Sequence, residues 1–430
     1  MRVFFGIALF FFGHLICANS DPVIWSGIGY FVDSGKTSSI YPNLTSLEKE
    51  LNLSKLLADE FSKNENLIIG GSENTSSDEG FNSVLIAVTS EKIRSTYRGI
   101  NSLDGKNICE RSYLLGTQVV LYSVSSKKIL KSLPNTTKKI YRDDSKKSLC
   151  NNASLDSKIH KSRFAEILWG FDLPKNSSSK NLGDVLTALN LSEKGMLANQ
   201  IDNIKKIKNV YEKGIQPIGV RNVVILEPAM KQLTGKSSGF NTHKDFVSKG
   251  EIKKEYKEWL GTMFSRWLSQ FLKIPVVPYY EGEGLTLNLG TTFTDSAEVL
   301  NLKKPELSYG FDYVLRSFAK VDAGENATQK GSVWAVYSGM KFGVVLGDQP
   351  EDFKSLAKIP ITQVTSRQYN KSDIIYDWDF YDLATQVGMA KLSENLVKQD
   401  KKWLKSSSEI PNKDFKKFSK TILNKVGYEK

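Results

Sequence analysis

The apolar positions of the chain include two similar blocks. The first, "YLLGTQVVLYSVSSKKILKSL" from Tyr113 to Leu133, has an apolar run on each side of a Ser/Lys-rich stretch. This pattern predicts two strands joined by a turn. The second, "GSVWAVYSGMKFGVVLG" from Gly331, also has a Gly, an apolar run ending in Tyr-Ser and another apolar run. It predicts a second hairpin.

Three further matches precede these hairpins in the same order. "GFNSVLIAV" from Gly80 corresponds to "GFDYVLRSF" from Gly310, and both predict strands. Upstream, a helix end followed by a strand is predicted by "LLADEFSKNENLIIGG" in the first half and by "RWLSQFLKIPVVPYY" in the second. Farther upstream, a first strand is predicted by "IWSGIGYFV" and by "RNVVILEPA". Four elements that recur in order indicate internal duplication.

Two helices of the second unit show clear periodicity. In the earlier one, apolar residues recur at i, i+3, i+4 and i+7, and the charged residues fall off this stripe. Because a strand follows at Ile274, we expect this helix to pack on a sheet; the alternative is a helix on a membrane surface. A closing helix begins near Asp377 and Asp379, which favour a helix N-terminus. The earlier stripe comprises Tyr256, Trp259, Leu260, Met263, Phe264, Trp267, Leu268, Phe271 and Leu272.

Each unit therefore predicts a strand, a long helix, a strand, a long strand, its hairpin partner and a closing helix. This order is typical of an α/β (α+β) fold in which helices pack on a mixed sheet. We expect two tandem, similar domains of ordinary size at residues 21–215 and 216–405. A signal peptide at residues 1–20 precedes them, and a basic C-terminal tail at residues 406–430 follows.

The N-terminus indicates export. In "MRVFFGIALFFFGHLICANS", Arg2 precedes an apolar core, and Ala18-Asn19-Ser20 suits cleavage before Asp21. Cys17 offers lipidation as an alternative, although the residues before it depart from a lipobox. The apolar run is shorter than a spanning helix requires, and no later segment is long and apolar enough to span a bilayer. We predict an exported protein, periplasmic in a bacterium or secreted.

Cysteine usage agrees with export. Removal of the signal peptide leaves Cys109 and Cys150, an even pair for which a disulfide is the default in an oxidising compartment. Closing that loop stabilises a fold by about 4 kcal/mol on the chain-entropy estimate. Metal binding is the alternative, but His160 and His243 are the remaining histidines and neither has zinc-finger spacing. We therefore predict a disulfide and no metal site.

The charge is strongly basic. The chain has 59 Lys and Arg against 47 Asp and Glu, a formal net charge of +12. An exported basic protein meets anionic lipid headgroups or acidic glycans, and the alternative is that the lysines are simply solvated. We expect no nucleic-acid partner, because the sequence lacks a basic groove interleaved with aromatic residues. Lysine clusters include Lys127-Lys128, Lys138-Lys139, Lys146-Lys147, Lys205-Lys206, Lys253-Lys254, Lys401-Lys402 and a final run at Lys413, Lys416, Lys417 and Lys420.

Enzyme signatures are weak. "GKSSG" at Gly235 to Gly239 matches G-x-S-x-G around Ser237, but no strand leads directly into the serine. The same segment lacks the first glycine of a phosphate loop. The paired Glu281 and Glu283 have no partner carboxylate for glycosidase chemistry. A calcium site at Asp373, Asp377, Asp379 and Asp382 lacks a ligand loop, and helix capping explains these residues. We predict no catalysis and no cofactor.

The order of elements resembles a known family. A helix with "LADEF", a short strand, a "GFxxVL" strand and the hairpin "VLYSVSSKKIL" at Val120 to Leu130 are similar to the periplasmic domain of CsgG-type curli-secretion lipoproteins and to the TolB amino-terminal domain. The hairpin lacks the Asp and turn Gly typical of that superfamily. Related domains occur in penicillin-binding-protein activators and FlgT-type flagellar ring components. The resemblance implies non-catalytic scaffolding in the periplasm.

Two functional hypotheses follow. The first is a cell-envelope scaffold or assembly accessory protein, associated with the outer membrane, that contacts envelope proteins or a second copy of itself through sheet edges or exposed helices. The second is a secreted binder of anionic glycan or lipid, similar in chemistry to lipopolysaccharide. Binding to an anionic surface falls with added salt, whereas a packed protein interface resists it. A secreted hydrolase is a minor third hypothesis.

Overall fold

A computed structural model provides the fold. It describes residues 23–31, 36–61, 67–69, 82–100, 104–123, 126, 129–173, 194–206, 218–233, 249–272, 274, 276–277, 279, 285–289, 299–302, 309–325, 331–346, 354–370 and 377–425. The fold is α/β, with two mixed sheets and helices packed on them, as predicted. None of the described helices has the length and apolar character needed to cross a membrane.

Sheet A has seven strands in the described ranges. They are β1 (Val23–Phe31), β2 (Leu67–Ile69), β3 (Asn82–Ile100), β4 (Asn107–Ser123), β5 (Ile129–Asp143), β8 (Leu285–Leu289) and β9 (Val299–Leu302). The order is β5-β4-β3-β1-β8-β9, and β2 also pairs with β1. β1 runs parallel to β2 and β3, whereas β3, β4 and β5 are antiparallel neighbours.

Sheet B repeats this plan. Its strands are β6 (Ile218–Ile225), β7 (Val276–Val277), β10 (Tyr309–Glu325), β11 (Gly331–Leu346) and β12 (Lys354–Asn370). The order β12-β11-β10-β6-β7 matches β5-β4-β3-β1-β2 strand for strand. The parallel and antiparallel pairings match as well. The two sheets therefore carry the repeated topology that the duplicated sequence pattern predicts.

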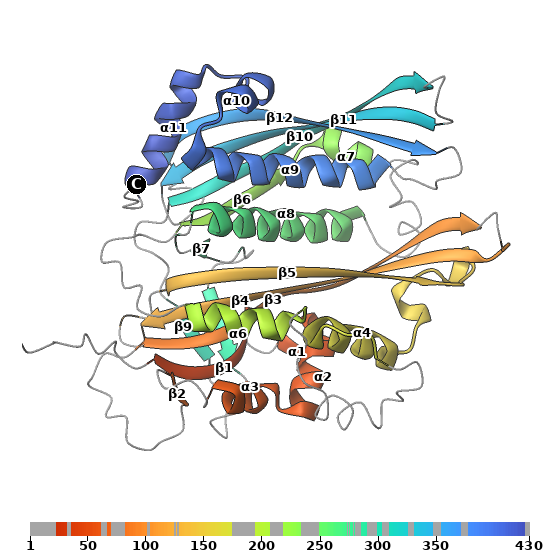
Figure 1. The fold of residues 1–430 in the computed structure, drawn as a ribbon, viewed down its shortest axis with the longest axis vertical. Helices are drawn as coiled ribbons and strands as arrows, with labels where there is room; N and C mark the ends of the chain where they lie inside the picture. Colours follow the sequence, from red (N-terminus) through yellow and green to blue (C-terminus); the bar gives the residue numbers. More distant parts are fainter. Residues whose placement is uncertain are drawn as a thin grey trace, which may run out of the picture.

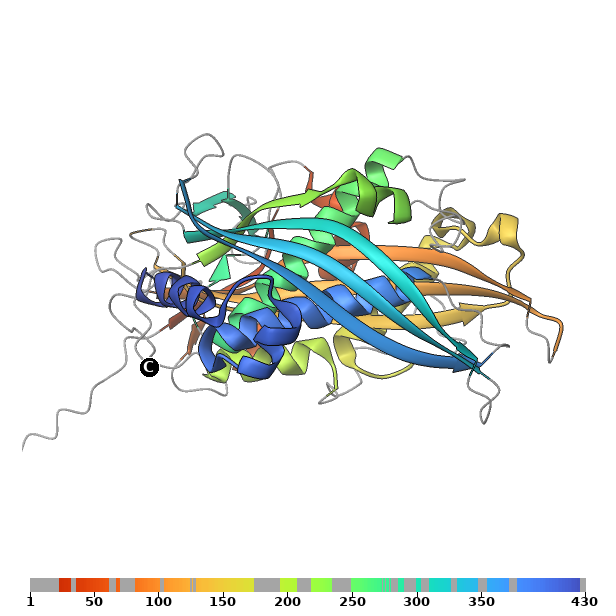
Figure 2. The same cartoon turned by 90° about the horizontal axis from the view of Figure 1, so that it is seen from above.

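The helices lie in layers around the sheets (Figure 1). Packed beside sheet A are α1 (Thr37–Ile40), α2 (Pro42–Leu51), α3 (Leu53–Phe61), α4 (Ser157–Trp169) and α6 (Met196–Lys206). Between the sheets lie α8 (Lys249–Leu272) and α9 (Asp377–Lys398), while α7 (Glu227–Leu233), α10 (Lys401–Ser407) and α11 (Asn412–Lys425) border sheet B. From above, β10, β11 and β12 run obliquely over the buried helices (Figure 2).

The apolar stripe of α8 explains its central position. Tyr256, Leu260, Phe264 and Leu268 are fully buried in the core that α8 shares with sheet B. The same helix also contacts sheet A, where Glu258 forms an ion pair of 2.6 Å with Lys92 of β3. A helix with such a wide stripe packs against a sheet, so the sheet-packing prediction for α8 is confirmed.

The predicted hairpin at Gly331 is wrong. β11 is one uninterrupted strand from Gly331 to Leu346, and its hairpin partner β12 begins only at Lys354. The turn was expected after Tyr337-Ser338, but the residues that follow continue the strand, next to a register shift in β10 between Leu315 and Ser317. Glycine in a strand often marks such an irregularity. The first predicted hairpin is confirmed as β4 and β5.

The β8-β9 hairpin joins the two halves of the chain. It belongs to the sequence range predicted as the second domain, 216–405, yet its strand β8 pairs with β1 of sheet A. Gly29 lies opposite Leu289, and Phe31 lies opposite Leu287. The boundary at residue 215 stays a prediction about sequence units, because the second unit contributes the β8-β9 hairpin to sheet A.

The outer strand β5 of sheet A is covered by the second unit. Ser269 of α8 donates a hydrogen bond to the Ser132 carbonyl oxygen at 3.1 Å, and Arg266 donates to the Thr136 carbonyl oxygen at 3.2 Å. In return, Ser132 and Gln118 donate to the Val276 carbonyl oxygen of β7 at 2.7 and 2.8 Å. An open strand edge is a template for pairing with other chains, and α8 occupies this one.

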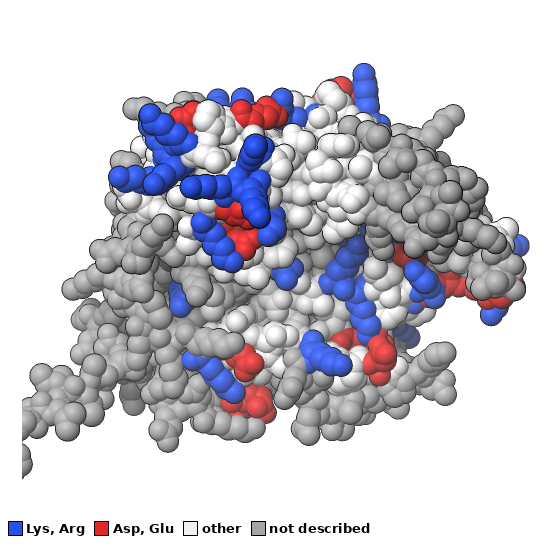
Figure 3. Space-filling view, turned by 45° about the horizontal axis from the view of Figure 1, so that its top comes forward, with Lys and Arg blue, Asp and Glu red and all other residues white. Residues whose placement is uncertain are grey.

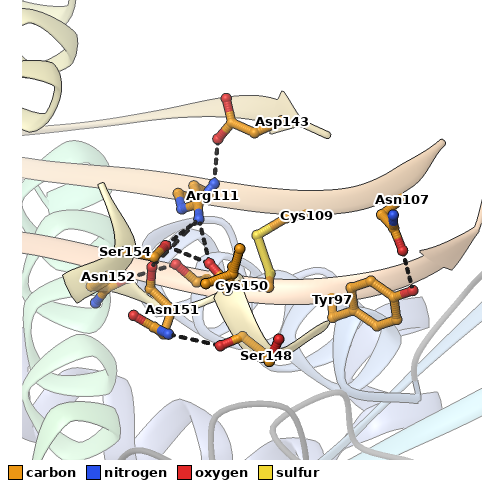
Figure 4. The surroundings of a disulfide bond; sticks show 12 residues. Tyr97, Asn107, Cys109, Arg111, Asp143, Ser148, Cys150, Asn151, Asn152 and Ser154 are labelled. Atoms are coloured by element: carbon orange, nitrogen blue, oxygen red, sulfur yellow. Dashed lines mark hydrogen bonds and ion pairs between the residues drawn. A yellow bond between two sulfur atoms is a disulfide. The ribbon is translucent and has the colours of Figure 1, made fainter. Parts of the chain in front are cut away.

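A disulfide joins β4 to the segment after β5. Cys109 and Cys150 are bonded, with Cα atoms 5.5 Å apart. Beside them, the buried Arg111 contacts Asp143, the Leu149 carbonyl oxygen and the Ser154 hydroxyl (Figure 4). The pair predicted from cysteine usage is therefore present, within a polar network at the far end of sheet A.

Candidate functional site

The chain turns outward where α9 ends. Gln399 adopts a positive φ of 55°, and the Asn395 side chain accepts a hydrogen bond from the Asp400 amide at 2.6 Å. Asp400 is then the N-cap of α10, accepting from the Lys402 and Trp403 amides. Aspartate is a favoured N-cap residue because its carboxylate satisfies free amides of the first turn. The bend places α10 beside β12.

The connection between α10 and α11 is fastened to sheet B. Ser408 forms a bridge with Ile361 of β12, and the Glu409 amide donates to the Pro360 carbonyl oxygen at 3.3 Å. The Ser408 hydroxyl accepts from the Ile410 amide at 3.2 Å. This connection therefore covers the outer edge of β12 as α8 covers β5.

α11 is strongly amphipathic. Phe415, Phe418, Ile422 and Leu423 are buried in the core of sheet B. The opposite face carries exposed lysines at i, i+3, i+4 and i+7, namely Lys413, Lys416, Lys417 and Lys420. Side chains at this spacing share one helix face. The apolar face holds α11 on the core, so the lysines point to solvent.

We define the lysine corner as the exposed lysines of α10 and α11: Lys401, Lys402, Lys405, Lys413, Lys416, Lys417 and Lys420. Figure 3 shows basic side chains gathered at the upper left, over this end of the molecule, with acidic ones between them. Across the described part of the chain, none of these seven ammonium groups forms an ion pair or hydrogen bond with another side chain. Such a cluster creates a positive potential that attracts anions.

An open hollow of about 580 Å³ lies within the lysine corner. Three of the lysines and the apolar residues Leu404, Ile410 and Pro411 line it, together with polar residues of the connection. The one carboxylate in its lining, that of Glu409, forms an ion pair of 3.2 Å with Arg316 of β10. The complete lining is Lys401, Lys402, Leu404, Lys405, Ser408, Glu409, Ile410, Pro411 and Asn412.

The enzyme candidates from the sequence do not assemble a site in the described ranges. Ser237, His243, Glu281, Glu283 and Asp373 lie outside those ranges. Asp377 begins α9, with Asp379 in its first turn, while Asp382 accepts a hydrogen bond from Gln386 at 3.2 Å. Among the residues that the structure describes, no three His, Cys, Asp or Glu side chains are grouped to hold a metal.

His160 has a structural environment. Its Nε2 lies 2.9 Å from the Asn152 carbonyl oxygen, so that nitrogen carries the proton, and Nδ1 accepts from the Tyr113 hydroxyl at 2.7 Å. Burial, together with the charges of Arg163 and Arg111, lowers the pKa of His160. The neutral imidazole is a link in the network near the disulfide.

The chain was compared with models of protein families and with curated proteins. It matches none of them. The geometry of the described residues therefore carries the functional argument, and the resemblance to CsgG-type and TolB amino-terminal domains stays a prediction.

Sequence reasoning named most of the lysines of this surface but not its hollow. The four α11 lysines and the Lys401-Lys402 pair appear as basic runs. Ile410 and Pro411 were missed, although a proline after a helical stretch marks a helix end. The hollow depends on the docking of residues 408–411 on β12, which no local pattern encodes.

Proposed function

We propose that the protein is a non-catalytic, exported binding protein that attaches to a phosphate-rich anionic surface through the lysine corner. The observation that carries the proposal is the set of seven exposed, unpaired lysines on two helices held firmly on the core. Binding an anion to unpaired lysines costs little free energy, because no internal ion pair must be broken first. The disulfide supports export.

Occupied backbone groups on the outer strands β5 and β12 favour this hypothesis over strand addition at these two strands. Strand addition needs free backbone groups along an outer strand. In β5, the Ser132 and Thr136 carbonyl oxygens already accept hydrogen bonds from α8. In β12, the Pro360 carbonyl oxygen accepts from Glu409. Exposed helices therefore offer the more accessible contact surface at these positions.

Lysine suits phosphate more than carboxylate. An ammonium group is a point charge that binds phosphate without fixed orientation, whereas planar carboxylates are matched by arginine. The lysine corner contains no arginine, since α10, α11 and their connection have lysine at every basic position. The composition thus favours headgroup or glycan phosphates over an acidic peptide.

Vesicle sedimentation tests the proposal. Each lysine near an anionic membrane contributes about 1 kcal/mol, so replacing four should weaken binding by up to about a thousandfold. The variant Lys413→Gln, Lys416→Gln, Lys417→Gln, Lys420→Gln is compared with wild type on phosphatidylcholine vesicles with and without phosphatidylglycerol. We expect wild type to bind only the anionic vesicles, with a strong salt dependence, and the variant to lose most of that binding.

A matched control changes the charge equally elsewhere. Lys49, Lys55, Lys147 and Lys158 are exposed in the first unit, away from the lysine corner. Their replacement by Gln should leave most vesicle binding intact. Equal loss in both quadruple variants, or equal binding to neutral vesicles, would show that attachment does not depend on the lysine corner.

Scaffolding in the cell envelope is the second candidate. The matching strand orders of sheets A and B agree with the tandem plan on which the CsgG-type resemblance rests. Crosslinking in the intact envelope followed by mass spectrometry should then recover a defined protein partner. Recovery of lipid-associated protein alone would count against this candidate.

A further inference from the structure

The hollow in the lysine corner differs from a simple basic surface because one wall is apolar. Ile410 is half-buried and Pro411 is exposed, and both line the hollow beside the buried Leu404. Lys401, Lys402 and Lys405 line it as well. A lysine side chain adds an apolar stem below its charge. A ligand in the hollow would meet cations at the rim and hydrocarbon beneath.

The hollow is held in place by hydrogen bonds. The Ser408 hydroxyl bonds to both the amide and the carbonyl oxygen of Ile410. The Glu409 amide is fixed on Pro360 of β12, and the Glu409 carboxylate pairs with Arg316. Little ordering is therefore required on binding, which favours affinity. The Arg316 pair also reduces the repulsion that Glu409 would exert on an anion.

We infer that this hollow takes the headgroup phosphate and the adjoining apolar segment of a single anionic phospholipid. The three lysines supply charge for the phosphate, and Ile410 and Pro411 supply contact for the hydrocarbon. The inference rests on the proposed attachment to an anionic surface and adds a bound lipid molecule to it. Two features favour a lipid over an acidic peptide: the lining has no arginine, and the neighbouring strand edge is occupied at Pro360.

Titration calorimetry with soluble lipids tests the inference. Dihexanoyl phosphatidylglycerol below its micelle concentration is titrated into the full chain, with dihexanoyl phosphatidylcholine, glycerol phosphate and a glutamate-rich peptide as comparisons. We expect the anionic lipid to bind at least about tenfold more tightly than each of the others. Equal affinity for glycerol phosphate would overturn the inference, because the apolar wall would then contribute nothing. Tighter binding of the acidic peptide would overturn it in favour of a protein partner.

Variants assign the binding to the hollow. Ile410→Thr and Pro411→Ser each remove apolar contact, and serine at this second position is a favoured N-cap for α11. The pair Lys402→Gln with Lys405→Gln removes charge from the rim. Each should weaken dihexanoyl phosphatidylglycerol binding by about tenfold without changing the circular dichroism spectrum. Unchanged affinity in Pro411→Ser and the lysine pair would overturn the inference.

The four-glutamine variant of α11 separates the two proposals. Its replaced lysines do not line the hollow, so it should bind the soluble lipid as wild type does even though it loses the vesicles. Loss of the soluble lipid in this variant would place the lipid on the α11 face instead. If the Pro411→Ser variant binds vesicles but not the soluble lipid, the proposed attachment to an anionic surface stands without depending on the lipid site.

Discussion

Replacing Asp143 with asparagine should destabilise the far end of sheet A. The Asp143 carboxylate, at the end of β5, accepts hydrogen bonds from Arg111 at 2.5 Å and from Arg163 at 2.6 Å. The Arg111 side chain is 0% exposed, that of Arg163 is 12% exposed and that of Asp143 is 23% exposed. A neutral amide in place of the carboxylate would leave two guanidinium groups, one fully buried, without their shared counter-charge.

The size of the stability loss in Asp143→Asn follows from the burial of the ion pair. Removing one partner of a buried ion pair costs about 3–5 kcal/mol, because the remaining charge stays desolvated. The partial exposure of Asp143 admits some water, so we expect a loss of about 3 kcal/mol in the free energy of unfolding. Burial opposes ionisation of Asp143, but hydrogen bonds and charges from Arg163 and Arg111 prevail and lower its pKa.

The lowered pKa fixes the sign of the pH dependence. The contribution of the Asp143 carboxylate to the free energy of unfolding is fully present above the pKa of about 3.9 that an aspartate has in the unfolded chain. It is lost as pH falls through the lower pKa of the folded protein. Asp143→Asn should therefore be less stable than wild type at neutral pH. The difference between them should shrink in strong acid.

Urea unfolding monitored by circular dichroism measures this effect. At neutral pH the midpoint of Asp143→Asn should fall with an unchanged slope. Asp104→Asn is the control, because Asp104 is 45% exposed and its Lys106 partner is 64% exposed and 3.9 Å away. Such an exposed pair contributes less than about 1 kcal/mol. Equal small shifts in both variants, or a difference that grows in acid, would refute the argument.

Two further predictions concern stability. The pKa of His160 is lowered in the folded protein, so as pH falls below about 6.5 the unfolded state takes up a proton first. Wild type should therefore lose stability in this range, and His160→Gln should lose less when urea unfolding is measured at several pH values. An equal decline of stability with pH in the two proteins would be the contrary result. In α8, a Cβ added at Gly261 would lie 2.2 Å from the Tyr279 ring. Gly261→Ala gains about 1 kcal/mol of helix propensity but displaces that ring, so we expect a net loss of about 2 kcal/mol. Gly219→Ala is the control, since its added Cβ lies 3.5 Å from Val277, and equal melting temperatures for the two variants would contradict the prediction.

Local patterns in the sequence predict α8, the first hairpin and the repeated strand order, but the long helix expected after the first strand of unit one is instead three short helices, α1, α2 and α3. The stripe that contains Tyr256, Phe264 and Leu268 identifies α8, because burial of one helix face requires that spacing. The turn expected after Tyr337-Ser338 is wrong, because glycine also occurs within long strands beside irregular pairing. Pairing of β8 with β1 joins segments that are far apart in sequence, and no local pattern specifies it.

The lysine corner also has a part that the sequence predicts and a part that it does not. Spacing alone places Lys413, Lys416, Lys417 and Lys420 on one helix face, so the basic stripe is visible in the sequence. The hollow is not visible, because its apolar wall forms only when Ser408 and Glu409 dock on β12. The lysines predict attraction to anions, and the tertiary contacts create a concave site.

The two copies of the repeat differ in how each protects its outer strand, and this difference locates the proposed function. In the first copy, α8 of the second unit covers β5 and is then buried between the sheets. In the second copy, α10, α11 and their connection cover β12. The polar face of this cover is exposed in the described part of the chain. The proposed binding surface is therefore the exposed side of the cover on the second copy, where the lysine corner lies.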